Sequence, residues 1–330
     1  MTTQPETPFA SVLEALFTAE DLPIHLLYRL SDMSESDFKQ FKEGWSSAEE
    51  TRRIALALHM AEIAEENYLI DFSPVFAFMF DDPSASVRIA ALDGVWDSED
   101  LSLVETILEM LAEDEDAGVR AAAARALAHY ILLAEWGQIS DSHTDTIVNS
   151  LLEAYDNRRN PLEVKRAALE AVSPSAHPRV PDMINDAYEE GSNEMQLSAI
   201  FAMGVSADER WLPYLEQELS SPSADFRAEA ARACGVIGGE SSVDALVQLI
   251  DDDDQEVGMA AISALGQIGG ERAFELLSRL AEDPNYEEYY DVIEDALDEL
   301  EWMDSAFDML AFPGDDEDDE DDILDQLRLN

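Results

Sequence analysis

The sequence predicts an all-α protein, a right-handed α-solenoid of stacked helix hairpins that ends in a disordered acidic tail. The first supporting observation is a template, with an apolar first column and mostly small residues in columns four, five and eight, that recurs along the chain. A second amphipathic segment of helical period follows the template, as in SSVDALVQLI after Glu240. No segment shows the alternation of a half-buried strand. Because one hairpin cannot bury its own apolar face, neighbouring hairpins must stack to cover it.

The template is clearest where DDDDQEVGMAAISALGQIGG is placed over SPSADFRAEAARACGVIGGE. Val257 then aligns with Phe226, an offset of 31 residues (257 − 226). Columns one, four, five, eight, nine and twelve fall on one side of a helix that turns about 100° per residue. Alanines there let helices approach closely, and the closing glycines suit a helix C-cap with positive φ. Copies of the template begin at Thr51, Val87, Val119, Val164, Met195, Phe226, Val257 and Tyr289.

The segment before the first copy differs from the repeats, and residues 1–50 predict an N-terminal helical cap. Its expected helices cover residues 11–18, 23–30 and 36–45. Ser34 and Asp37 have the spacing of a capping box, with Asp in place of Glu or Gln. The segment is expected to cover the first hairpin, and a binding role for Phe38, Phe41 and Trp45 is the alternative. Residues 51–302 then predict the repeat solenoid, with about eight hairpins.

The composition changes abruptly near the C-terminus, and residues 303–330 predict an acidic disordered tail. Eight consecutive acids, from Asp315 to Asp322, cannot pack into a core. The last residues keep an apolar stripe, Ile323, Leu324, Leu327 and Leu329. This stripe predicts a short linear motif that docks on a partner or folds back on the solenoid.

Several motifs resemble the HEAT-repeat family, especially its bacterial branch related to phycobilisome bilin lyases. They are DDPSASVRIAAL at Asp81, DEDAGVRAAAARAL at Asp114, and the glycine-closed runs ACGVIGG and ALGQIGG. The resemblance covers about Thr51 to Trp302 and implies the fold more strongly than the function. It also implies an arginine ladder, in which Arg88, Arg120 and Arg227 bond to carboxylates or carbonyls of adjoining turns. Gln196 and Gly258 replace the corresponding arginine in two copies, which puts the ladder in doubt there.

The charge of the chain limits its partners. The formal net charge is −55, from 74 Asp and Glu residues against 19 Lys and Arg residues. Such a field repels nucleic acid and anionic membranes and attracts basic proteins. No apolar run approaches the roughly 18 residues of a membrane span, and the N-terminus lacks a signal-peptide pattern. The single cysteine, Cys234, is expected in the core; it excludes an intramolecular disulfide and leaves the redox compartment undecided. A cytoplasmic address fits these observations and is the one we expect.

Motifs for catalysis are missing from the sequence. The five histidines lack metal-ligand spacing, and no nucleophile motif or glycine-rich phosphate loop occurs. We therefore expect no enzymatic activity, no cofactor and no metal ion. The resemblance to bilin-lyase relatives keeps a bilin-lyase-like enzyme or a tetrapyrrole chaperone as one alternative. A structural repeat protein whose acidity is an adaptation to high salt is another.

Two surfaces are candidates for binding a protein. Acidic turns before the template helices predict an acidic ridge, whose alternative role is helix capping and solubility. Its residues are Asp81, Asp82, Asp114, Asp116, Asp251, Asp252, Asp253 and Asp254. Columns three, six, seven and ten predict an apolar groove on the concave face, unless packing between repeats covers them. Its residues are Ile89, Leu92, Trp96, Leu197, Ile200, Phe201, Met259 and Ile262. The expected function is a non-catalytic scaffold or adaptor that binds a basic or amphipathic protein segment.

Overall fold

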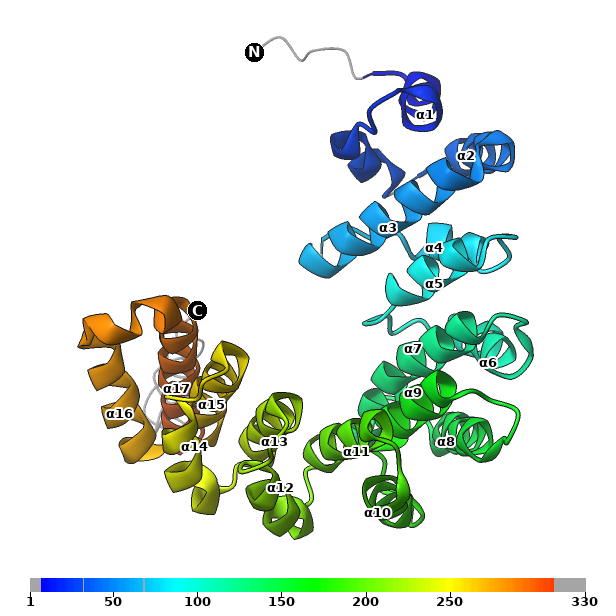
Figure 1. Ribbon diagram of the computed structural model, residues 1–330. Helices are drawn as coiled ribbons and strands as arrows, with labels where there is room; N and C mark the ends of the chain where they lie inside the picture. Colours follow the sequence, from blue (N-terminus) through cyan, green and yellow to red (C-terminus); the bar gives the residue numbers. More distant parts are fainter. Residues whose placement is uncertain (1–6, 32, 68, 312–330) are drawn as a thin grey trace, which may run out of the picture. The chain divides into compact units, whose positions relative to one another are not determined.

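The computed structural model describes residues 7–31, 33–67 and 69–311 (Figure 1). Over these residues it contains α-helices, short 3₁₀-helices and loops, and no strand. This confirms the all-α solenoid class. The chain divides into two compact units, Met1–Ala202 (unit 1) and Met203–Asn330 (unit 2), with the boundary inside helix α11.

The helices alternate between two series. The template helices are α3 (Glu50–Glu66), α5 (Ala85–Asp93), α7 (Ala117–Glu135), α9 (Leu162–Val172), α11 (Asn193–Val205), α13 (Ala224–Ile237), α15 (Gln255–Ile268) and α17 (Tyr290–Ala311). The companion helices are α4 (Ser73–Met79), α6 (Val104–Glu113), α8 (Asp141–Asp156), α10 (Val180–Glu190), α12 (Leu212–Glu218), α14 (Val243–Leu249) and α16 (Gly270–Glu282). Short 3₁₀-helices lead into several of them: η2 (Leu101–Leu103), η3 (Glu209–Trp211), η4 (Glu240–Ser242) and η5 (Pro284–Tyr289). Seven predicted template starts fall in a helix of the first series, and Tyr289 directly precedes α17.

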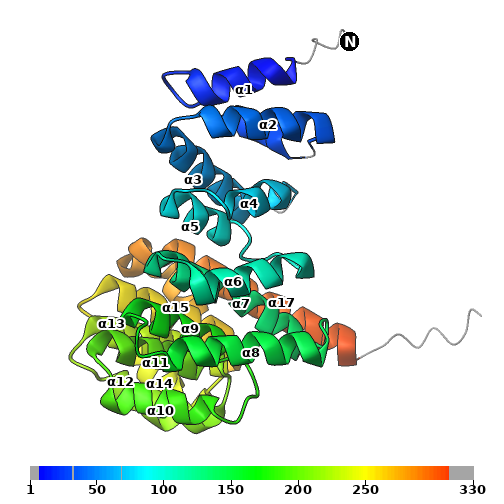
Figure 2. The same cartoon turned by 90° about the vertical axis from the view of Figure 1, so that its right-hand side faces the viewer.

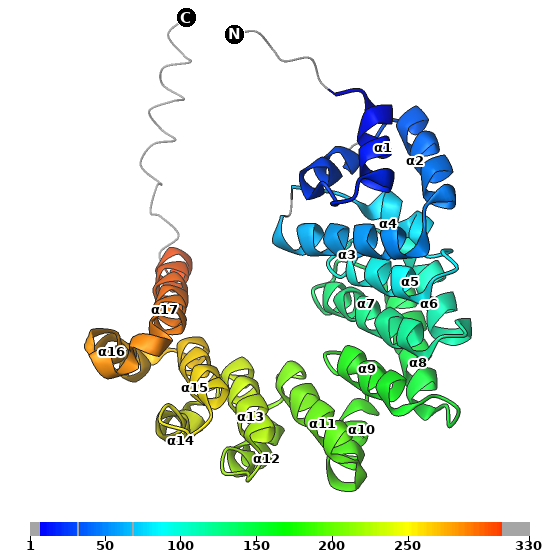
Figure 3. The ribbon, with the colours of Figure 1, turned by 45° about the horizontal axis from the view of Figure 1, so that its top comes forward.

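The stacking follows the alanine columns. In unit 1, α3, α5, α7 and α9 pack side by side, while α5, α7 and α9 each pack on the companion helix before them (Figures 1 and 3). In unit 2, α13, α15 and α17 repeat this arrangement. Ala122 and Ala123 of α7 are buried, as are Ala260 and Ala261 of α15. The small side chains leave room for the next helix, so the core of each unit runs between successive template helices.

Glycines end the template helices where the sequence predicts. Gly238 follows α13 with a φ of 76° and donates its N–H to the carbonyl of Cys234, 3.2 Å away. Gly269 follows α15 and also has a φ of 76°. Only glycine adopts this left-handed region without strain, so the C-cap prediction is confirmed.

The two ends of the chain differ from the repeats. The N-terminal segment forms α1 (Phe9–Thr18), the 3₁₀-helix η1 (Ile24–Leu30) and α2 (Glu35–Ser47). The Ser34 hydroxyl accepts from the N–H of Asp37 at 3.2 Å and donates to its carboxylate at 2.8 Å, a variant of the predicted capping box. The predicted boundary at residue 302 falls inside α17, and the rest of the predicted tail, 312–330, lies outside the described residues. This includes the apolar motif from Ile323 to Leu329.

Candidate functional site

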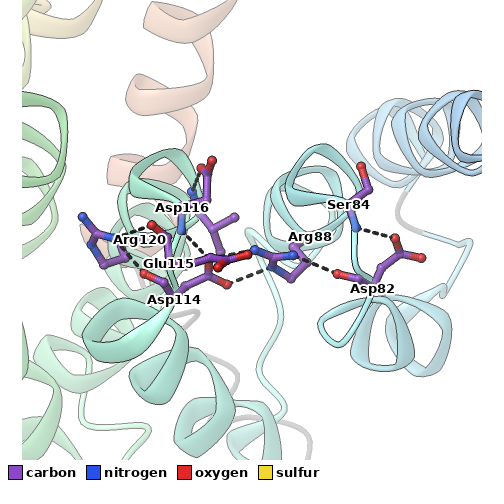
Figure 4. A network of polar contacts seen from close by, with 8 residues as sticks. Asp82, Ser84, Arg88, Asp114, Glu115, Asp116 and Arg120 are labelled. Atoms are coloured by element: carbon purple, nitrogen blue, oxygen red, sulfur yellow. Dashed lines mark hydrogen bonds and ion pairs between the residues drawn. The ribbon is translucent and has the colours of Figure 1, made fainter.

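Charged side chains link successive turns of unit 1 (Figure 4). Arg88 of α5 donates from Nε and Nη2 to the two carboxylate oxygens of Asp114, each at 2.8 Å, and from Nη1 to the carbonyl of Asp82 at 2.8 Å. The side chains of Arg88 and Asp114 are each about one tenth exposed. A bidentate pair of this kind fixes the orientation of both groups, so Arg88 ties the turn before α5 to the turn before α7.

Asp82 is the centre of a second link in unit 1. Its carboxylate accepts from Nε1 of Trp45 at 2.7 Å, from Nε of Arg53 at 2.9 Å and from the N–H of Ser84 at 2.9 Å. The Asp82 side chain is 3% exposed and that of Arg53 is 12% exposed. Asp82 therefore joins α2, α3 and the start of α5, and it is not accessible to a partner.

The other ladder arginines follow the same geometry with different acceptors. Arg120 donates to the carbonyl of Asp114 at 2.7 Å and, from Nε, to the amide oxygen of Asn160 at 3.3 Å, so this rung is an ion–dipole contact. In unit 2, Arg227 is bidentate to Asp252 at 2.7 and 2.8 Å and also reaches the carbonyl of Ser221. The contacts implied by the family resemblance are thus present at all three arginines.

The two copies that lack the arginine use other groups. Gln196 of α11 donates from its amide nitrogen to the carbonyl of Tyr188 at 2.8 Å. At Gly258 of α15 a Cβ atom would lie 2.8 Å from the hydroxyl of Tyr289, whose ring fills the place of a long side chain. Tyr286 then donates to the Asp251 carboxylate at 2.8 Å. In these two copies, other side chains of the same or the next repeat therefore take the place of the arginine.

These contacts change the prediction of an acidic ridge. Asp82, Asp114 and Asp252 are engaged by arginines, so they cannot form a free carboxylate surface. Asp116 and Asp254 accept from backbone N–H groups of the helices that follow them, which is the capping role left open by the sequence. Asp81 and Asp253 are exposed, and Asp251 is exposed while accepting from Tyr286. A role for these three in binding stays a prediction.

The residues of the predicted groove differ in exposure according to their template column. Column six (Leu92, Ile200, Ile262) is fully buried, which overturns the exposure predicted for these three residues. Column three (Ile89, Leu197, Met259) is half-buried. Phe201 in column seven is 40% exposed and Trp96 in column ten is 43% exposed. Column six lies about 60° from packing column nine on a helical wheel, so the buried face of these helices is wider than the packing columns alone.

A pocket of about 340 Å³ opens in unit 1, and Ile89 is the predicted groove residue among those that line it. It is lined by Ile89 of α5, by Gly118, Ala121 and Arg125 of α7, and by Glu163, Arg166, Ala167 and Glu170 of α9. Nη2 of Arg125 lies 3.4 Å from the carboxylate of Asp93. Nε of Arg166 donates to the hydroxyl of Ser198 at 2.7 Å, and that hydroxyl donates to Glu170. The pocket thus has an apolar floor and a rim with both signs of charge; we call this surface of α5, α7, α9 and α11 the template-helix face.

A comparison with protein families agrees with this repeat architecture. The family model of HEAT repeats matches residues 72–171 and 212–298, which is 187 of the 330 residues (100 + 87). The chain belongs to the HEAT-repeat family. No curated protein matches it significantly.

The chain is also similar to several solved structures. One is the Escherichia coli protein YibA, at 17% identity and a TM-score of 0.43, covering 73% of this chain and 96% of that one. Human deoxyhypusine hydroxylase in complex with glycerol gives 17% identity and a TM-score of 0.33, covering 89% and 96%. The karyopherin Kap121p, bound to the extreme C-terminus of the protein phosphatase Cdc14p, gives 16% identity and a TM-score of 0.43, covering 88% and 37%.

Four further observations concern metal binding, membrane spanning, the single cysteine and the N-terminal aromatic residues. Among the described residues, no group of three or more His, Cys, Asp and Glu side chains is arranged to hold a metal ion. No helix in the described part of the chain is long and apolar enough to cross a membrane. Cys234 is buried as expected, and burial raises the pKa of its thiol to about 11. Phe41 and Trp45 are also buried, so of the three aromatic residues with an alternative binding role only Phe38 is partly accessible.

The ladder pair in unit 2 predicts a dependence of stability on pH. Two hydrogen bonds from Arg227 hold the pKa of the Asp252 carboxyl below its ordinary value. Because the folded pKa is the lower one, this stabilisation is present above the unfolded pKa of about 3.9 and is lost as the pH falls through the folded pKa. Between about pH 5 and pH 2, the free energy of unfolding should therefore fall more steeply for the wild type than for Asp252→Asn. Chemical denaturation at several pH values measures both slopes, and parallel slopes would contradict the coupling.

Proposed function

We propose that this chain is a non-catalytic scaffold or adaptor of the cytoplasm, and that its template-helix face binds a basic or amphipathic segment of another protein. The observation that carries this proposal is the partial exposure of apolar side chains in columns three and seven of the template helices α5 and α11. Ile89 and Leu197 are half-buried in column three, and Phe201 is 40% exposed in column seven. Partly exposed apolar side chains on a face that also carries a pocket are a common feature of protein-binding surfaces.

The charge of the chain supports a cationic partner. The net charge of −55 attracts basic proteins over several ångströms and raises their association rate. Glu163 at the rim of the pocket is exposed. A partner that places apolar side chains on the pocket floor and a lysine or arginine beside Glu163 would match both features. Asp81 and Asp253 remain candidates for steering such a partner.

Site-specific photo-crosslinking in lysate of the native organism tests the proposal. A benzophenone amino acid replaces Phe201, and in a matched control it replaces Asn149, which is exposed on companion helix α8. We expect one or a few discrete crosslinked proteins from position 201 and weaker or no crosslinks from position 149. Raising the salt concentration should reduce the crosslinked fraction, since screening weakens steering. Equal crosslinking from both positions would contradict the proposal.

A further inference from the structure

The first helices of unit 1 form a second surface with a different character. A groove of about 560 Å³ lies between α1 and α2. It is lined by Ala10, Leu13, Glu14, Phe17 and Thr18 of α1, by Gln40, Glu43, Gly44 and Ser47 of α2, and by Ala48 and Glu49. We call it the α1–α2 groove. Figure 2 shows α1 and α2 as the last layer at the N-terminal end of unit 1.

The groove is built from two matching stripes. On α1 the lining residues recur at intervals of three and four, from Ala10 to Thr18, and on α2 they do the same from Gln40 to Ser47. Such intervals place side chains on one face of a helix. At Gly44 a Cβ atom would lie 2.5 Å from the Phe17 ring, so the glycine lets this ring lie across α2. Phe17 is held there by the rings of Phe41, at 5.9 Å, and Trp45, at 6.5 Å between centroids.

The residues that line the groove carry charge of one sign. Its lining residues include three carboxylates, Glu14, Glu43 and Glu49, and neither lysine nor arginine is among them. Lys42 lies on another side of α2, with its ammonium 4.4 Å from the centroid of the Phe38 ring. A peptide in the groove would therefore meet an apolar floor between acidic edges.

We propose that the α1–α2 groove binds a short cationic amphipathic helix of another protein. Inside the solenoid each pair of helices is covered by the next hairpin, and among the described residues no further hairpin covers the two stripes of α1 and α2. The acidic edges select lysine or arginine beside the apolar face of the occupant. A second copy of this chain, with 74 acidic residues against 19 basic ones, is repelled by the same edges. Because α1 has ten residues, the groove accepts about three helical turns.

A local fluorescent reporter on the full chain tests this proposal. Cys234 is buried with a raised thiol pKa, so a cysteine introduced at an exposed site is the one that reacts with a dye. Ser36 is exposed and precedes Gln40 by one turn on the same stripe of α2, so Ser36→Cys reports on the groove. Asn149→Cys on α8 is the control position. The probe is a synthetic helix of about 18 residues, with leucine on one face and lysine on the other.

The charge of two glutamates of the groove is then reversed in one double variant, and a second double variant reverses two glutamates elsewhere as a control. Glu14→Lys with Glu43→Lys changes the groove, and Glu65→Lys with Glu66→Lys makes the same change of charge at exposed residues of α3. We expect a saturable response of the Ser36 dye, weakened about tenfold by the first pair and less than about twofold by the second. A peptide with glutamate in place of lysine should give no response. Phe201→Gln should leave the response unchanged, because the template-helix face is a separate surface.

Three results would overturn the proposal. One is a Ser36 dye that does not respond to the cationic peptide, and another is an equal loss of affinity in the two double variants. The third is a dimer in sedimentation that Glu14→Lys with Glu43→Lys changes, because the occupant would then be a second copy. Each of them leaves the crosslinking experiment at Phe201 unaffected, so the two proposals fail separately.

Discussion

Replacing Asp82 with alanine is expected to lower the free energy of unfolding by about 3–5 kcal/mol. The substitution leaves the guanidinium of Arg53, whose side chain is 12% exposed, without its carboxylate. It also leaves Nε1 of the buried Trp45 without an acceptor and removes the side-chain acceptor of the Ser84 N–H. A buried donor that loses its partner costs more than the net energy of the bond it made, because its desolvation is no longer offset.

The neighbouring residue supplies the control. Asp81 is exposed and stands beside Asp82 in the same acidic turn, so Asp81→Ala should change the free energy of unfolding by no more than about 0.5 kcal/mol. Chemical denaturation followed by circular dichroism measures both variants. Hydrogen–deuterium exchange should show that the loss of protection in Asp82→Ala centres on α2, α3 and α5. If the two alanine variants were equally stable, Asp82 would not be the structural residue that its contacts indicate.

The difference between Asp81 and Asp82 shows what the sequence could have revealed. In the copies that start at Val87 and Val119 the ladder arginine lies six residues after an aspartate, as Arg88 follows Asp82 and Arg120 follows Asp114. In each case the arginine donates to the carbonyl of that aspartate. This spacing is a signal for which acid of a turn is structural. The bond from Trp45 to Asp82 spans 37 residues, and no local pattern predicts it.

The fold was predictable because each of its determinants is local and repeated. The alanine columns, the closing glycines and the interval between copies are all properties of single helices and turns. The extent of the buried face was not predictable in the same way. It depends on how closely the neighbouring helices surround each template helix, which is a property of tertiary packing. The α1–α2 groove was missed because it involves Phe17 and Gly44, which belong to no repeated template.

Adjacent residues of α11 give the second large prediction. Ile200 is fully buried, and Phe201 is 40% exposed. Ile200→Asp removes a packed side chain and places an ionisable group in the core, so we expect a loss of about 4 kcal/mol or more in the free energy of unfolding. Phe201→Gln removes a partly exposed ring and should cost about 1 kcal/mol. Denaturation curves of the two single variants measure these values.

The contrast also decides how binding at the template-helix face must be tested. A change at column six reduces binding by disturbing the fold, so loss of a partner in Ile200→Asp would say nothing about the surface. A change at column seven leaves the core intact, so loss of the partner in Phe201→Gln can be assigned to the surface itself. If Ile200→Asp were as stable as Phe201→Gln, column six would be accessible after all. The apolar surface would then extend over both columns, as the helical period alone had predicted.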